Sequence, residues 1–198
     1  MYPLFLEQPS YAIAFWLAYA AWAVLELTVM LFTRRAGARA RGRDRGSFFA
    51  VLLGIWGGLG LSFWLAFALP GAAILWARPL VFWLGIALML VGVALRWYAV
   101  RVLGRYFTRI VTVQEQQPVV QSGPYRYIRH PAYSGSLLTF LGIGLALGNW
   151  ASLLAFMACT LSAFGYRIAV EERMLRDSLG QPYVDYMKRT RRLVPFVF

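Results

Sequence analysis

The chain has 198 residues, of which 60% are hydrophobic and only 14% are charged. A soluble domain carries about 25% charged residues, so this composition excludes an ordinary soluble domain and indicates one domain that folds in lipid. The formal net charge of +12 comes from Lys and Arg residues gathered between apolar runs, a pattern that argues against nucleic-acid binding and favours cytoplasmic loops of a membrane protein.

Three membrane spans are predicted in the first half of the chain, because a spanning helix needs about 20 mostly apolar residues. The first covers residues 10–33 and is interrupted only by Glu26. Six arginines follow in the segment 34–45, "RRAGARARGRDR", which places this loop in the cytoplasm. The second and third spans cover residues 47–69 and 79–100, so the third also ends on the cytoplasmic side.

The second half begins with a long polar connection at residues 104–131 and continues with two shorter apolar runs, 132–147 and about 151–168. Since the "GNW" between these runs favours a tight turn, we expect a helical hairpin over 132–168. The complete fold is then all-α with about five transmembrane helices, the N-terminus outside and the C-terminus inside. It divides into a scaffold for substrate access, 1–103, and a catalytic region, 104–198.

Chemically active side chains gather in two blocks, "QPVVQSGPYRYIRHPAYSG" at 117–135 and "YRIAVEERMLRDSLGQPYVDYMKRTRRLVP" at 166–195. The predicted hairpin begins at one block and ends at the other. We therefore expect these two blocks to meet at the cytoplasmic surface.

The first block holds the chain's one histidine, His130, directly before Pro131. Proline favours the first turn of a helix, so His130 is expected at the N-terminus of the fourth span. The free N–H groups and positive dipole end found there favour anions and a neutral imidazole. The sequence thus predicts a binding corner for a carboxylate, with Tyr125 and Tyr133 beside it.

The second block pairs Arg167 with Glu171, and Glu172 with Arg176, at helical spacing. Carboxylates at the end of an apolar span are energetically costly unless they are paired or bind a ligand. Two interpretations therefore stay open, a ladder of ion pairs at the membrane interface and a ligand site.

Two further charges, Glu26 and Arg96, fall inside predicted spans. They either pair with each other or Arg96 extends toward the cytoplasmic side. Other features are interpreted as packing: Cys159 as a buried apolar side chain, and the glycines of "GIWGGLG" (54–60) and "GIGLALG" (142–148) as close helix contacts. No disulfide, zinc pattern or other metal site is expected.

The two blocks together resemble the isoprenylcysteine carboxyl methyltransferase family, whose pattern is shared by integral-membrane phospholipid methyltransferases. The family pattern is GxYxxxRHPxYxG, a helical hairpin, and then EExxL…GxxYxxY…P, and the same elements stand here in order between Gly123 and Pro195. The resemblance covers about residues 105 to 198.

The resemblance implies an S-adenosylmethionine-dependent methyltransferase whose cofactor pocket lies on the cytosolic side, between the 104–131 connection and the amphipathic C-terminal segment. It implies that the cofactor contacts come from seven residues: Val119, Val120, Tyr125, His130, Pro131, Tyr133 and Glu171. Arg167 would orient the polar head of the acceptor.

The acceptor is expected to be a lipid-like or prenylated molecule from the bilayer. If it is a carboxylate, Arg167 clamps it and no base is needed; if it is an amine, Glu172 or a tyrosine must take a proton. The alternatives are a phospholipid or small-amine N-methyltransferase, an NADPH-dependent membrane sterol or enone reductase, and a scaffold or transporter without enzymatic activity. The arginine- and alanine-rich loops favour a bacterial inner membrane.

Overall fold

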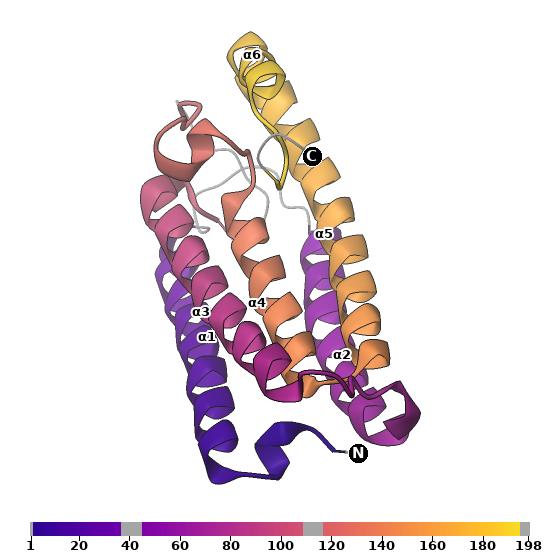
Figure 1. Cartoon of the computed structure of the whole chain (residues 1–198). Coiled ribbons are helices and arrows are strands. Elements are labelled where there is room, and N and C mark those ends of the chain that lie inside the picture. Colours follow the sequence, from indigo (N-terminus) through magenta and orange to yellow (C-terminus); the bar gives the residue numbers. More distant parts are fainter. Residues whose placement is uncertain (1, 37–44, 109–116, 195–198) are drawn as a thin grey trace.

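The protein is a bundle of long helices in this computed structural model, which describes residues 2–36, 45–108 and 117–194 (Figure 1). The α-helices are α1 (Pro9–Ala36), α2 (Arg45–Ala68), α3 (Arg78–Leu103), α4 (Pro131–Leu147), α5 (Trp150–Leu179) and α6 (Gln181–Arg189). Short 3-10 turns accompany them: η1 (Leu4–Leu6), η3 (Pro70–Ala72), η4 (Gly104–Tyr106) and η5 (Gly123–Arg126). Successive long helices run in alternating directions, and the N-terminus lies at the end of the bundle opposite to α6 (Figure 1).

Helices α1, α2, α3 and α5 are long and apolar enough to cross a membrane. Helix α4 is also apolar but has 17 residues, about 25 Å at 1.5 Å per residue. It runs through the middle of the bundle (Figure 1), and most of its residues are buried. Large apolar side chains such as Trp56 and Trp64 are exposed on the outside, as expected where the solvent is lipid. The predicted all-α, multi-pass membrane architecture is confirmed.

The five predicted spans correspond in order to α1–α5, and the largest difference in extent is at the end of α5. We expected the second limb of the hairpin to end near residue 168, whereas α5 continues to Leu179. Hydropathy falls where the charged residues begin, but the helix does not end there, and other parts of the chain bind Glu171 and Glu172 just beyond that point. The division at residue 103 stays a prediction.

Glycines allow α3 and α4 to pack backbone against backbone. A Cβ at Gly92 would lie 2.5 Å from the carbonyl oxygen of Gly135, and a Cβ at Gly135 would lie 2.7 Å from that of Gly92. Contacts this short leave no room for a side chain. The crossing therefore fixes the depth of α4, and with it the position of His130, the N-cap of α4.

The remaining glycine predictions have mixed outcomes. In the 54–60 stretch, Gly54 and Gly58 do lie against α5, where an added Cβ would meet Ala163 or Cys159. In the 142–148 stretch, Gly142 lies against Gly85 of α3 and Gly144 against Leu153 of α5, but Gly148 ends α4 with a φ of +66° and has nothing within 4 Å of an added Cβ. Its role is to allow the left-handed turn between α4 and α5, rather than to pack helices.

The turn at residues 148–150 confirms the predicted hairpin. The Asn149 side chain caps α5 by accepting a hydrogen bond from Ser152 N at 3.1 Å, and its Nδ2 donates to Leu69 O at 2.9 Å. This brings the two chemically active blocks side by side at the opposite end of the hairpin.

A C-terminal clasp, defined as residues 190–193, runs beside residues 127–130. Arg129 N donates to Arg191 O at 2.7 Å, His130 N donates to Arg192 O at 3.0 Å, and Arg191 N donates to Tyr127 O at 3.2 Å. These backbone bonds hold the end of the second block against the start of α4.

Candidate active site

A cavity of about 190 Å³ lies between the helices where the two blocks meet. Aromatic and aliphatic side chains of α1 and α2 form one wall: Trp22, Phe48, Val51, Leu52, Ile55 and Trp56. Polar side chains from η5, α4, α5 and their flanks form another: Tyr125, Arg129, His130, Tyr133, Arg167 and Glu171. The cavity therefore offers both an apolar and a polar surface to one bound molecule.

Behind the polar wall, the buried carboxylate of Glu172 binds basic side chains from two other parts of the chain. Its Oε1 accepts from Arg129 Nε at 2.8 Å and lies 3.3 Å from His130 Nε2, while Oε2 accepts from Arg192 at 3.0 Å. Because an ionised carboxylate only accepts hydrogen bonds, Nε2 of His130 carries the proton in this contact. The predicted anion corner thus holds a carboxylate of the protein itself.

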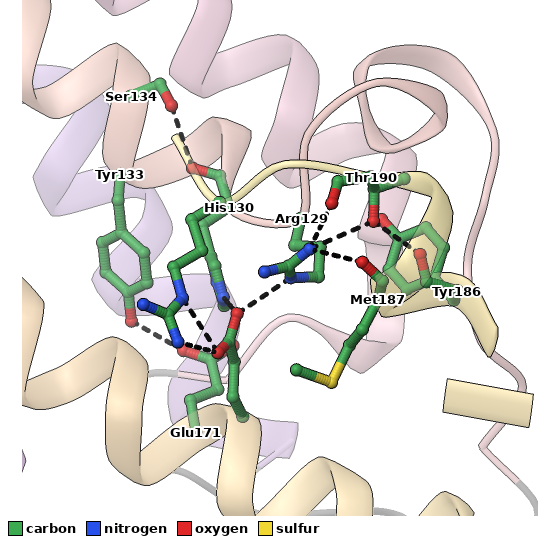
Figure 2. Close-up of polar contacts among 10 residues, drawn as sticks. Arg129, His130, Tyr133, Ser134, Glu171, Tyr186, Met187 and Thr190 are labelled. Carbon is green, nitrogen blue, oxygen red and sulfur yellow. Dashed lines mark hydrogen bonds and ion pairs between the residues drawn. The ribbon is translucent and has the colours of Figure 1, made fainter. Parts of the chain in front are cut away.

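Arg129 extends this network to the last turn of α6. Figure 2 shows its guanidinium between His130 and the backbone of Met187 and Thr190. Its Nη1 donates to Met187 O at 3.1 Å and also to Thr190 O. One set of charged hydrogen bonds therefore holds the start of α4 against α5, the end of α6 and the clasp. Such bonds are stronger than neutral ones.

The hydroxyl of Tyr133 joins the two ionisable side chains of α5 that line the cavity. It donates to Glu171 Oε2 at 2.9 Å (Figure 2) and accepts from Arg167 Nε at 3.3 Å. Arg167 is also held by Ser47, whose Oγ accepts from Nη1 at 2.7 Å. A carboxylate and a guanidinium thus stand on either side of one phenol, at the polar wall of an otherwise apolar cavity.

Tyrosines form the boundary between the cavity and the clasp. Tyr186 donates through its hydroxyl to Tyr125 O at 2.7 Å. Burial raises the pKa of Tyr186 to about 12, although the nearby Arg129 acts to lower it. Burial, followed by the charges of neighbouring carboxylates, also raises the pKa of Tyr125 and of Tyr183, so all three stay protonated at neutral pH.

Most of the predicted site residues line the cavity: Val119, Val120, Tyr125, His130, Tyr133, Arg167 and Glu171. Pro131 and Glu172 are not among its lining residues. Pro131 begins α4 beside His130, and Glu172 lies in the charged network behind the wall. The roles assigned to these residues stay predictions.

Sequence reasoning assigned no catalytic or binding role to several residues that the fold brings to the site. Arg129 was recognised only as part of a motif, and Ser47 and Trp22 stand in segments that look like any apolar span. Glu26 and Arg96 do pair, through both carboxylate oxygens, and both line the cavity. Their intramembrane charge was the signal that could have placed them here.

Comparison with known proteins gives a consistent picture. The chain is 36% identical to protein-S-isoprenylcysteine O-methyltransferase B of Arabidopsis thaliana over 57% of its own length and 58% of that protein. It is 33% identical to the protein-S-isoprenylcysteine O-methyltransferase of Schizosaccharomyces pombe over 54% of this chain and 46% of that one. The chain thus spans about half to three fifths of the length of these relatives.

A solved structure of the eukaryotic intramembrane Ras methyltransferase ICMT shares the fold, with a TM-score of 0.60 at 24% identity, over 78% of this chain and 54% of that one. The family model described as phospholipid methyltransferase matches residues 80–182. That range covers just over half of the chain and runs from the start of α3, through the whole polar wall of the cavity, into α6. On this match the protein belongs to the phospholipid methyltransferase family.

Proposed function

We propose that the protein is an S-adenosylmethionine-dependent methyltransferase that methylates a carboxylate of a lipid-like acceptor, of the isoprenylcysteine type named for its relatives. The observation that carries this proposal is the arrangement of Glu171, Tyr133 and Arg167 at the polar wall of an apolar cavity. Glu171 supplies negative charge for a cationic, hydroxyl-rich cofactor, and Arg167 supplies positive charge for an anionic acceptor.

The side chains around Glu171 suit the proposed cofactor. Bound there, it would supply a methyl group on a sulfonium, whose S–CH₃ bond breaks as the O–CH₃ bond of the ester forms. Glu171 would accept hydrogen bonds from the ribose hydroxyls or the ammonium group, and Val119, Val120 and the tyrosine rings would cover apolar parts. The tyrosines between the cavity and the clasp would also shield the bound molecules from water, which favours a reaction between a cation and an anion that gives neutral products.

A carboxylate acceptor agrees better with the surroundings of Glu172 than an amine does. An amine must lose a proton before it attacks, and Glu172 is already bound by Arg129, Arg192 and His130. A carboxylate needs no base, and Arg167, fixed by Ser47 and Tyr133, can hold it in a near-attack position. We therefore assign Glu172 to positioning Arg129 and His130, and Arg167 to orienting the acceptor.

The proposal includes an active site on the cytoplasmic face of the membrane. The end of α1 at Ala36 and the start of α2 at Arg45 flank the arginine-rich segment, and they lie toward the same end of the bundle as the start of α4 (Figure 1). Such segments stay on the cytoplasmic side. The bacterial inner membrane stays a prediction.

The test is a calorimetric titration of the detergent-purified protein with S-adenosylhomocysteine. We expect micromolar binding that Glu171→Gln weakens at least tenfold, because the uncharged amide no longer attracts a cationic group. The matched control is Glu7→Gln at the opposite end of the bundle, which should bind like the wild type. Absence of binding to folded wild-type protein would remove the proposal, and NADPH would then be titrated.

Once binding is established, the acceptor class follows from transfer of a radiolabelled methyl group. Base-labile label on a carboxylic acid that carries an S-prenyl thioether, formed by the wild type and lost in Arg167→Lys, supports O-methylation. Label that resists base and appears on an amine headgroup instead would assign the protein to N-methylation.

A further inference from the structure

Aromatic and basic side chains gather at the end of α3 that lies beside the cavity. Trp97 and Tyr98 are 48% and 49% exposed, and Arg101 follows one turn later, in the last turn of the helix. Helix α3 is long and apolar enough to cross a membrane. Its end therefore lies at the level of the lipid headgroups, where exposed tryptophan and tyrosine side chains are typical.

Arg101 lies over an aromatic ring and not beside a carboxylate. Its guanidinium carbon is 4.5 Å from the centroid of the Trp97 ring, and a ring face attracts a cation without neutralising its charge. Among the described residues, no acidic side chain forms an ion pair with Arg101. The negative end of the α3 dipole offsets only part of the charge, so the guanidinium remains available to an anion from outside the chain.

A second pair of the same kind stands at the end of η5. The guanidinium carbon of Arg126 is 5.9 Å from the centroid of the Tyr127 ring, and both residues are exposed. In the part of the chain that the structure describes, Arg126 also has no ion pair with an acidic side chain. Turn η5 packs directly on α3, because a Cβ added at Gly123 would lie 3.0 Å from the hydroxyl of Tyr98. Two elements in contact thus carry two cations that lack an internal counter-charge.

We propose that Arg101 and Arg126, with the rings of Trp97 and Tyr127, form a headgroup site that binds the phosphate of an anionic phospholipid. Guanidinium groups bind phosphate oxygens through charge-assisted hydrogen bonds, and anionic lipids attract basic residues next to a membrane span. A lipid suits this site better than a soluble anion does, because Leu90, two turns before Trp97 on the same face of α3, is 48% exposed and offers a surface to an acyl chain.

The headgroup site is separate from the proposed active site. Neither arginine is among the residues that line the cavity, so the lipid is a ligand of the outer surface and not the methyl acceptor. The inference therefore goes beyond the proposed function and does not depend on it.

The experiment measures lipid occupancy by native mass spectrometry of the full chain, released from a neutral detergent. Phosphatidylglycerol, which is anionic, and phosphatidylcholine, which is zwitterionic, are added at equal concentrations. We expect the wild type to retain the anionic lipid about tenfold more than the zwitterionic one. Arg101→Gln and Arg126→Gln should each lower this preference about fivefold, the contribution of one basic residue near an anionic headgroup.

The matched control is Arg173→Gln, which removes the same charge from an exposed position on α5 and should keep the wild-type preference. All of these positions are exposed, and unchanged unfolding temperatures would show that the variants fold. Inorganic phosphate, added at the concentration of the lipid, should displace none of it.

Three outcomes would overturn the inference. Equal retention of the two lipids by the wild type would show that no anionic headgroup is recognised. Equal losses of preference in Arg101→Gln, Arg126→Gln and Arg173→Gln would show a diffuse effect of net charge and not a site. Displacement of phosphatidylglycerol by inorganic phosphate would show that the site takes a soluble anion.

Discussion

Glu172 shows how one buried carboxylate connects elements that are distant in sequence. Its side chain is 4% exposed, and it binds Arg129 and His130 before α4 as well as Arg192 in the clasp. Taking these charges out of water is expensive and is compensated only while every partner is present. The residue therefore contributes to holding the polar wall in place, although it does not line the cavity.

We predict that Glu172→Gln lowers the stability of the protein by about 3–5 kcal/mol, because Arg129 would stay buried without its carboxylate. The measurement is thermal unfolding in detergent, followed by circular dichroism. Glu7→Gln is the control, because Glu7 forms a partly exposed pair with Arg78 and such pairs contribute about 0–1 kcal/mol. Similar losses in the two variants would contradict the role given to Glu172.

Residue spacing alone could predict which residues surround the cavity but not which of them face it; the family resemblance, and not the spacing, selected Glu171 over Glu172 for the cofactor. The motif spacing specified Tyr133, His130 and the two adjacent glutamates. Whether Glu171 or Glu172 points into the cavity depends on the rotation of α5 against α4, which is set by packing along the whole hairpin. Trp22 lay beyond prediction for a similar reason, since nothing in an apolar span marks the face that meets a cavity.

At the scale of elements, the α3–α4 crossing determines where the polar wall begins. Helix α4 carries His130 and Tyr133 at its start, and Gly92 and Gly135 let it approach α3 without intervening side chains. The sequence indicated that glycines serve packing, but it did not indicate which pairs meet, because this depends on the crossing angle and register of two helices.

We predict that Gly92→Ala destabilises the protein by about 1–3 kcal/mol, since the added methyl group would meet backbone atoms of α4 that cannot move aside. Gly60→Ala in α2 is the matched control, because an added Cβ there has nothing within 4 Å and alanine favours a helix over glycine. In thermal unfolding, we expect a lower unfolding temperature for Gly92→Ala than for the wild type, and an equal or higher one for Gly60→Ala. Equal stability of both would show that the crossing can widen without cost.

A second element-scale prediction concerns the C-terminal clasp. Arg191 is exposed, but its backbone N–H donates to Tyr127 O at 3.2 Å, so Arg191→Pro removes a backbone bond while Arg191→Ala removes only the side chain. We expect Arg191→Pro to weaken binding of S-adenosylhomocysteine several-fold, because the clasp holds the start of α4, and Arg191→Ala to bind like the wild type. Titration calorimetry measures both, and equal affinities would show that the backbone pairing does not support the site.

At the scale of the whole molecule, hydropathy was sufficient to predict the number, order and direction of the long apolar helices α1 to α5. Apolar length and the position of arginines are properties of single segments, so they can be read without knowing which helices touch. The cavity is a different kind of feature, because its walls come from α1 to α6 and exist only after all of them have packed. Its two walls were therefore predicted unequally: the polar wall was predicted well from its motifs, whereas of the rest only the pairing of Glu26 with Arg96 was foreseen, as one of two alternatives.

The tyrosines between the cavity and the clasp make the assembled molecule sensitive to alkaline pH. Below about pH 10, Tyr186 is protonated in both the folded and the unfolded chain. Between pH 10 and about 12 the unfolded chain loses this proton first, because burial raises the pKa in the folded protein, and stability must fall as pH rises through this window. The raised pKa values of Tyr125 and Tyr183 act in the same direction.

We therefore predict that the unfolding temperature falls steeply between pH 10 and 12, together with the ultraviolet absorbance change of tyrosinate. Tyr186→Phe should be less stable than the wild type at pH 8, because it lacks the hydrogen bond to Tyr125 O, but should lose less stability across the alkaline window. Tyr127→Phe, at an exposed tyrosine nearby, should follow the wild type at both pH values. If the unfolding temperatures of Tyr186→Phe and the wild type fall equally between pH 10 and 12, ionisation of the buried Tyr186 is not the cause of the alkaline loss of stability.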